Sequence, residues 1–168
     1  MAKSTLPPMT SVQKFLADLL CRNVEIEEGK AVKPEPRKPV AVATYADTDG
    51  TVKAMCVFDL ELANFAGASL SLIPVGLAKD SVRGREVPPS IEENLLEICN
   101  IGARLFDHPK HTSVRFQQAY LPQGELPDDV SASLQENGER VNFKVEIKGY
   151  GTGSMSLLRT AEEEQQEA

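Results

Sequence analysis

The sequence predicts a single α+β domain with a largely antiparallel sheet and two long helices packed on one face. Three observations predict this class. The chain has 168 residues, enough for one domain to bury its own core. Hydrophobic residues make up 41% and charged residues 26%, a profile typical of globular proteins. Helix and strand patterns do not alternate strictly, because the expected order is α-β-β-β-α-α-β-β.

The two ends of the chain are expected to lie outside this domain. Residues 1–9 are short, contain Pro7-Pro8 and predict a flexible N-terminus. Residues 161–168 read AEEEQQEA, which offers no apolar face to bury, so an acidic flexible tail is expected there. The domain itself should span residues 10–160.

The first expected elements are a helix and a short strand. Thr10 or Ser11 is expected to cap the helix, because apolar residues follow at i, i+3, i+4 and i+7 spacing. These residues are Val12, Phe15, Leu16, Leu19 and Leu20. Residues 24–26 predict the short strand, and residues 30–39, with three prolines and four basic residues, predict an extended connector.

A hairpin and a buried helix follow the connector. Residues 40–46 and 52–58 predict two strands, which Asp49-Gly50 joins in a turn. Asp59 should cap a largely buried helix that ends before Pro74.

The remaining segments predict a loop, a long helix and three strands. A loop is expected over residues 75–87. Ser90-Ile-Glu-Glu93 reads as a capping box that begins a helix running to about Phe106. The later elements are a strand at 114–120, a loop with one or two helical turns at 126–136, an alternating strand at 141–148, and a last strand ending near Leu158.

Composition and motifs exclude several classes of function. The formal charge of −7 disfavours a nucleic-acid surface and an anionic membrane surface. The N-terminus lacks a signal-peptide pattern and no stretch resembles a membrane span, so a cytoplasmic protein is expected. Cys21, Cys56 and Cys99 are widely spaced and predict reduced core thiols, and His108 and His111 predict surface residues, so no metal site is expected.

One helix carries a compact polar face. On a helical wheel, the apolar residues of 91–106 fall on one side. The opposite side gathers four polar residues: Glu93, Glu97, Asn100 and Arg104. A plain solvated face remains an interpretation, but the like charges at i, i+4 and an asparagine in mid-helix are both unfavourable there. Gly102, on the apolar side, suggests that another backbone packs closely against it.

A second copy of the local pattern occurs upstream. Glu61 and Asn64 repeat the E-x-x-N spacing of Glu97 and Asn100, and small residues follow both pairs. The repeat is coincidental, or it marks a duplicated helix that packs on its twin. A second site at Glu61 and Asn64 is therefore an open alternative.

The stretch from Glu97 to Gly102 and the order of elements resemble the CheC/CheX/FliY superfamily of bacterial chemotaxis phosphatases, and most closely its CheX branch. The resemblance covers about residues 10–158. It implies that Glu97 and Asn100 enter the active site of a phosphorylated, CheY-like response-regulator receiver domain and speed loss of its aspartyl phosphate. Asn100 would orient the attacking water and Glu97 would pair with a receiver lysine. Glu93 and Arg104, on the same face, are expected to contact the receiver.

The resemblance also bears on cofactors, and this chain departs from the family pattern at one position. It implies no cofactor on the chain itself, because the receiver holds the Mg²⁺. The family usually has Ser or Asp four residues before the motif glutamate, whereas this chain has Glu93. Some relatives bind partners without known catalysis, so an interaction module of the same fold is the alternative function. A sheet edge with unpaired groups also allows a homodimer.

Overall fold

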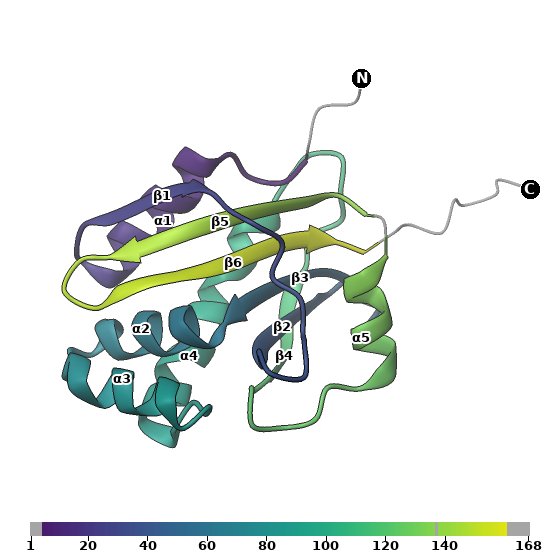
Figure 1. The fold of residues 1–168 in the computed structure, drawn as a ribbon. Coiled ribbons are helices and arrows are strands. Elements are labelled where there is room, and N and C mark those ends of the chain that lie inside the picture. Colours follow the sequence, from purple (N-terminus) through teal and green to yellow (C-terminus); the bar gives the residue numbers. More distant parts are fainter. Residues whose placement is uncertain (1–4, 137, 161–168) are drawn as a thin grey trace, which may run out of the picture.

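The structure, a computed structural model, describes residues 5–136 and 138–160. Six antiparallel strands form one sheet in the order β1-β5-β6-β3-β2-β4 (Figure 1). The strands are β1 (Val24–Glu28), β2 (Val40–Ala46), β3 (Val52–Asp59), β4 (Arg115–Tyr120), β5 (Arg140–Ile147) and β6 (Gly151–Arg159). The helices are α1 (Met9–Leu20), α2 (Leu60–Leu70), α3 (Val75–Arg83), α4 (Pro89–Ile101), α5 (Asp128–Gln135) and a 3-10 helix, η1 (Gly102–Phe106), that continues α4. The predicted α+β class with a mainly antiparallel sheet is confirmed.

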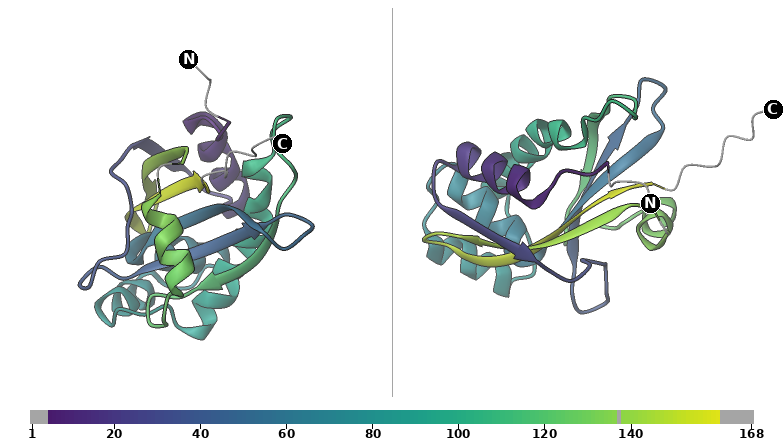
Figure 2. Two further views of the ribbon diagram at one scale, coloured as in Figure 1. Left: turned by 90° about the vertical axis from the view of Figure 1, so that its right-hand side faces the viewer. Right: turned by 90° about the horizontal axis from the view of Figure 1, so that it is seen from above.

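The sheet is strongly twisted and buried on both faces at its centre. Figure 2 shows that the β2–β3 hairpin diverges from the β5–β6 hairpin, as the right-handed twist of strands requires. Every residue of β2 is buried, and alternate residues face two different cores. Ala41, Ala43 and Tyr45 join the larger core with α1, α2 and α4, whereas Val40 and Val42 pack under α5. Helices therefore cover both faces, because α5 buries Val130 and Leu134 against the face that α2 and α4 leave free.

The helices α2 and α4 cross in close contact. A Cβ atom at Gly67 would lie 2.6 Å from Ile91 Cγ2 and 2.9 Å from Ile91 O, so only glycine allows this approach. Asn94 strengthens the crossing, because its Nδ2 donates to Gly67 O at 2.8 Å and to Ser71 Oγ at 2.6 Å.

The prediction that another backbone packs closely against Gly102 is wrong. The nearest atom to a Cβ there would be the Tyr45 hydroxyl oxygen, at 3.2 Å. That hydroxyl donates to Cys99 O at 2.6 Å and ties α4 to β2. The backbone approach expected at Gly102 occurs instead at Gly67.

Several helices begin directly after a proline and not at a polar N-cap residue of the kind predicted. Asp59 caps α2 as predicted, accepting from Leu62 N at 2.8 Å. The capping box at Ser90 and Glu93 is wrong, because α4 begins at Pro89 and has no side-chain cap bond. Proline fits the first helical position, where its fixed φ suits the helix and its missing N–H is not needed. The cap predicted at Thr10 or Ser11 is also wrong, because α1 begins at Met9, has Pro8 at its N-cap position and has no side-chain cap hydrogen bond.

The segment expected to be a loop over residues 75–87 contains the helix α3. The preceding helix does not run up to Pro74 as predicted, because α2 ends at Leu70 with Ser71 as its C-cap. Pro74 stands instead at the N-cap position of α3. The exposed face of this short helix explains the weak sequence signal, since Ala78 and Ser81 are its only fully buried residues.

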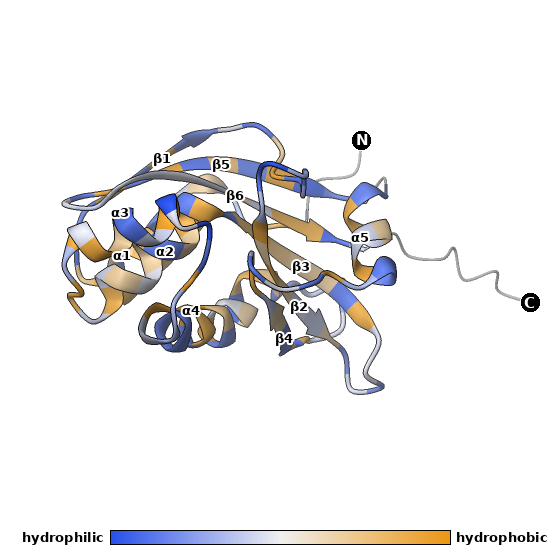
Figure 3. Ribbon diagram, turned by 60° about the horizontal axis from the view of Figure 1, so that its bottom comes forward, coloured by the Kyte–Doolittle hydropathy of each residue, from blue (hydrophilic) through white to orange (hydrophobic). Residues whose placement is uncertain are grey.

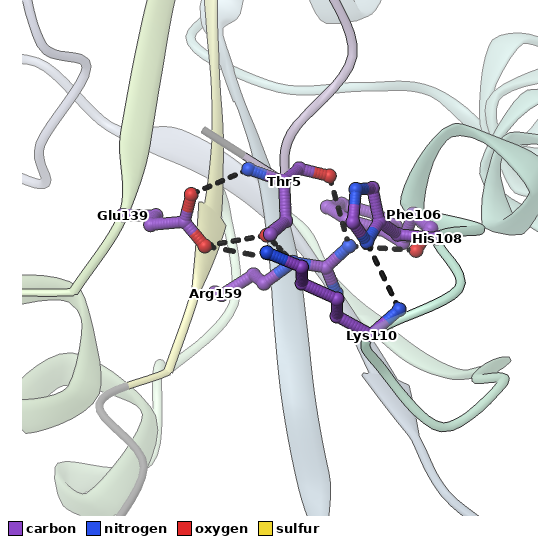
Figure 4. A network of polar contacts seen from close by, with 6 residues as sticks. All are labelled: Thr5, Phe106, His108, Lys110, Glu139 and Arg159. Carbon is purple, nitrogen blue, oxygen red and sulfur yellow. Dashed lines mark hydrogen bonds and ion pairs between the residues drawn. The ribbon is translucent and has the colours of Figure 1, made fainter. Parts of the chain in front are cut away.

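The described part of the expected flexible N-terminus is anchored. Thr5 N donates to Glu139 Oε1 at 2.6 Å, and Leu6 is buried. Arg159, only 5% exposed, donates to Thr5 Oγ1 at 2.7 Å and to Phe106 O at 2.7 Å (Figure 4). One buried guanidinium thus joins the N-terminal segment, β6 and η1. Residues 1–4 and the predicted acidic tail at 161–168 lie outside the described residues.

The two edges of the sheet differ in charge. Edge strand β1 exposes Glu25, Glu27 and Glu28, which disfavours pairing with another strand. Edge strand β4 carries one charged residue, Arg115. The homodimer allowed by the sequence stays a prediction.

Candidate functional site

The polar face predicted on α4 is exposed in the structure. The four residues of this face, which we call the α4 stripe, are Glu93, Glu97, Asn100 and Arg104, and all four are exposed. Glu97 and Asn100 are three residues apart in one α-helix, so their side chains are neighbours on its surface. Asn100 lies in the last turn of α4 and not in mid-helix, so the cost of placing an asparagine there is smaller than expected.

The polar groups of the stripe have no partners within the described residues. Neither Glu97 nor Asn100 makes a side-chain hydrogen bond or an ion pair with residues 5–136 or 138–160. Asn94 on the same helix provides the contrast, because its amide is used to hold α2. The stripe is therefore available to a second molecule.

The opposite face of α4 fixes the position of the stripe. Its inward residues are all buried in the larger core: Ile91, Leu95, Ile98 and Cys99. Tyr45 bonds to the backbone near the end of the helix, and Gly67 brings α2 close near its start. Figure 3 shows the resulting two-sided helix, with hydrophobic residues toward the protein and hydrophilic ones outward. Such a rigid helix can present Glu97 and Asn100 in a defined geometry.

The second E-x-x-N pair has a different environment. Asn64 is 0% exposed, and its Nδ2 donates to Leu60 O at 3.1 Å and to Glu86 O at 3.0 Å. It thereby fastens the segment between α3 and α4 to α2, while its Oδ1 is buried without a partner. Although α2 and α4 pack together, the two motifs do not form a common site, because only the pair on α4 is exposed. A second docking site at Asn64 is not formed in this structure.

Glu61, the other residue of that pair, lies beside Asp59. Burial, and to a smaller extent the charge of the nearby Glu61, raises the pKa of Asp59 to about 6. The hydrogen bond from Leu62 N opposes this shift. Sequence reasoning assigned Asp59 only a capping role, because its proximity to Glu61 in a buried corner depends on the tertiary fold.

The described residues contain no cluster of three His, Cys, Asp or Glu side chains that would hold a metal ion. His108 Nδ1 accepts from Lys110 N, and the His108 and His111 rings lie 6.0 Å apart. Cys56 and Cys99 are buried as predicted, and burial raises the pKa of Cys99 to about 12, which keeps it a thiol. The prediction for Cys21 is wrong, because this thiol is exposed at the end of α1. None of the helices in the described residues has the length and apolar character needed to cross a bilayer.

Comparison with known proteins identifies the fold. No protein-family model matches the chain, and no curated protein matches its sequence. A chain in the crystal structure of the CheX–CheY–BeF3–Mg²⁺ complex from Borrelia burgdorferi matches with a TM-score of 0.53 and 15% identity, over 88% of this chain and 92% of that chain. The FliM middle domain from Vibrio alginolyticus matches with a TM-score of 0.53 and 12% identity, over 90% and 88%. FliY from Thermotoga maritima matches with a TM-score of 0.49 and 15% identity, over 91% and 84%.

At 12% and 15% identity, the matches to the FliM middle domain and to the chain from the CheX–CheY complex show a shared fold. The likeness establishes the fold of this chain, with the α4 stripe on one of its helices. CheX and the FliM middle domain match it equally well, so the fold by itself does not distinguish their activities.

Proposed function

We propose that this protein is a phosphatase that removes the aspartyl phosphate of a CheY-like response-regulator receiver domain. The observation that carries the proposal is the exposed, unpartnered pair Glu97 and Asn100 on a helix fixed by its buried face. The fold shared with the CheX–CheY–BeF3–Mg²⁺ complex supports it, since CheX is the bound partner of CheY there.

The chemistry needed from this chain is modest. Water attacks the phosphorus atom, the bond between phosphorus and the aspartyl oxygen breaks, and the products are inorganic phosphate and the free aspartate. The transition state is loose and depends on positioning and charge more than on a strong base. The Asn100 amide both donates and accepts hydrogen bonds, so it can orient the attacking water in line. The receiver supplies the Mg²⁺ that neutralises the phosphoryl oxygens, so this chain needs no metal of its own.

Glu97, in this proposal, acts through docking. Its exposed carboxylate pairs with a lysine of the receiver and sets the register in which Asn100 meets the phosphoryl group. Arg104 and Glu93 flank the pair and contact the receiver surface. We further propose that the reaction takes place in the cytoplasm, where receiver domains act.

The test is dephosphorylation of phosphorylated receiver domains from the same genome by wild type, Asn100→Ala and Glu97→Ala. Asn23→Ala and Glu125→Ala are matched controls, because both are exposed residues of the same types outside α4. We expect Asn100→Ala to slow phosphate loss by about 100-fold, through the lost positioning of water. Glu97→Ala should instead weaken receiver binding. Equal rates in wild type and Asn100→Ala would refute the assigned site.

A non-catalytic interaction module is the second candidate function. Glu93 favours it, because its exposed carboxylate adds negative charge beside the pair that would approach a phosphoryl group. The equal fold similarity to the FliM middle domain also favours it. This function predicts a stable complex with a receiver domain and no acceleration of phosphate loss by wild type.

A further inference from the structure

A groove of about 660 Å³ lies away from the α4 stripe, between the connector of residues 30–39 and the adjoining ends of α2 and α3. We call it the connector groove. Its volume is within the range of about 300–1,000 Å³ that is common for ligand sites. Figure 1 shows the connector crossing β5 and β6 on its way to β2, and Val32 N donates to Ser156 Oγ at 2.9 Å where it passes β6.

Positive charge lines both walls of the connector groove. The five exposed basic residues along it are Lys30, Lys33, Arg37, Lys38 and Arg85. Four belong to the connector, and Arg85 faces them from the end of α3. The one ion pair among them joins Lys38 to the exposed Glu35 at 3.9 Å, as far as the described residues show. Basic residues outnumber Glu35, the one acidic residue of these walls, so the rim attracts anionic groups. This concentration is notable in a chain of net charge −7.

Hydrogen-bond acceptors lie between these walls. Asp59 and Glu61 line the groove together with apolar Val40, Leu60 and Val82. Both acids are half-buried, and no basic side chain in the described ranges forms an ion pair with either. The interior of the groove therefore accepts hydrogen bonds, while its rim donates them.

The connector backbone supplies further free donors. Among its N–H groups, those of Val32, Glu35 and Lys38 donate to other described residues. Four N–H groups make no such bond: those of Lys30, Ala31, Lys33 and Arg37. The predicted extended connector is confirmed only for residues 30–34, because residues 35–38, Arg37 included, form a turn that Lys38 N closes by donating to Glu35 O at 3.0 Å. The extended part, with its three free N–H groups, can add to another extended backbone, as in peptide recognition by strand addition.

From this arrangement we propose that the connector groove binds an extended acidic peptide segment of a partner protein. Acidic side chains would meet the basic residues at the rim, and backbone N–H groups would donate to Glu61 and Asp59 inside. A nucleic-acid strand fits less well, because its backbone carries a negative charge at every phosphate and no N–H donor, whereas a peptide backbone offers an uncharged N–H at each residue for the two carboxylates. The peptide is therefore the better match to a basic rim around an acidic interior.

The experiment measures fluorescence anisotropy of labelled octaglutamate, octaglutamine and octa-deoxythymidine with the full chain. Lys33→Glu/Arg85→Glu reverses one charge on each wall. Lys14→Glu/Lys79→Glu is the matched control, because both lysines are exposed and outside the groove. Urea unfolding checks that both double variants remain folded. We expect the groove variant to bind octaglutamate at least about tenfold more weakly than wild type, and the control to change binding less than about threefold.

Glu61→Ala separates a peptide from a general polyanion. It should weaken octaglutamate binding, because N–H donors lose their acceptor, and it should strengthen any binding of octa-deoxythymidine, because a repulsive charge is removed. Octaglutamine should not bind. Equal loss in both double variants, tighter octaglutamate binding by Glu61→Ala, or no octaglutamate binding by wild type would each overturn the proposal. Glu97→Ala/Asn100→Ala should bind octaglutamate as wild type does. Failure of the phosphatase assay would therefore not count against peptide binding in the connector groove.

Discussion

Replacing Gly67 by alanine should destabilise the protein, although alanine is the better helix former by about 1 kcal/mol. The reason is the crossing of α2 and α4. A Cβ atom at this position would lie 2.6 Å from Ile91 Cγ2 and 2.9 Å from Ile91 O. The methyl group can shift with its side chain, but the carbonyl belongs to the backbone of α4. Overpacking of this kind costs about 1–3 kcal/mol, so after the gain in helix propensity we expect a net loss of up to about 2 kcal/mol.

Gly76→Ala is the matched control in a second helix. A Cβ atom at Gly76 would meet nothing within 4 Å, so the same chemical change carries no steric cost. Alanine should stabilise α3 there by about 0.5–1 kcal/mol. Urea unfolding of wild type and the two variants measures both free energies. The two substitutions should change the free energy of unfolding in opposite directions. A Gly67→Ala variant as stable as Gly76→Ala would refute the steric explanation.

A double variant tests whether Ile91 causes the effect. Ile91→Ala alone should cost about 2–5 kcal/mol, because this side chain is buried. Combined with Gly67→Ala, the cost should fall short of the sum by about 1 kcal/mol, since the clash with Cγ2 is gone. If the two costs in the free energy of unfolding simply add, contact with the Ile91 side chain is not the cause of the Gly67→Ala effect.

Three further predictions concern Asp59, Asn64 and Arg159. The folded-state pKa of Asp59, about 6, exceeds its usual 3.8, so the folded protein holds this proton more tightly than the unfolded chain. Its contribution to stability is present below pH 3.8 and is lost as pH rises through about 6. Asp59→Asn, which keeps a capping oxygen, should remove about 3 kcal/mol of that decline in unfolding titrations. Asn64→Leu should lower stability by about 1–3 kcal/mol, by leaving Glu86 O without its donor, yet leave receiver dephosphorylation unchanged. Arg159→Gln should cost about 3 kcal/mol and expose the segment around Thr5 to limited proteolysis, whereas an unchanged cleavage pattern would show that other contacts hold it.

The exposed pair on α4 was predictable because its signal is local. Residues at i and i+3 share a helix face whatever surrounds the helix, and the apolar spacing already placed Ile91, Leu95 and Ile98 on the opposite side. The α2 cap at Asp59 and the turn at Asp49-Gly50 were predictable for the same reason, since each depends on a few consecutive residues.

The alternatives that sequence left open required the tertiary structure. Asn64 and Asn100 stand in the same E-x-x-N spacing, yet one is buried under the segment after α3 and the other is exposed. Local pattern cannot separate them, because burial depends on which other element covers the helix. The predicted contact at Gly102 was wrong for a similar reason, since its neighbour, Tyr45, lies 57 positions away in sequence.

The sequence by itself determined the α+β class, most of the strands and the chemistry of the α4 stripe, because periodicity and spacing are properties of short segments. Only the tertiary structure decided which motif is exposed, that α5 covers the second face of the sheet, and that the connector's basic residues face Arg85 across a groove. Those features join residues far apart in the chain, and their free energy comes from contacts that exist only after the sheet and helices have packed.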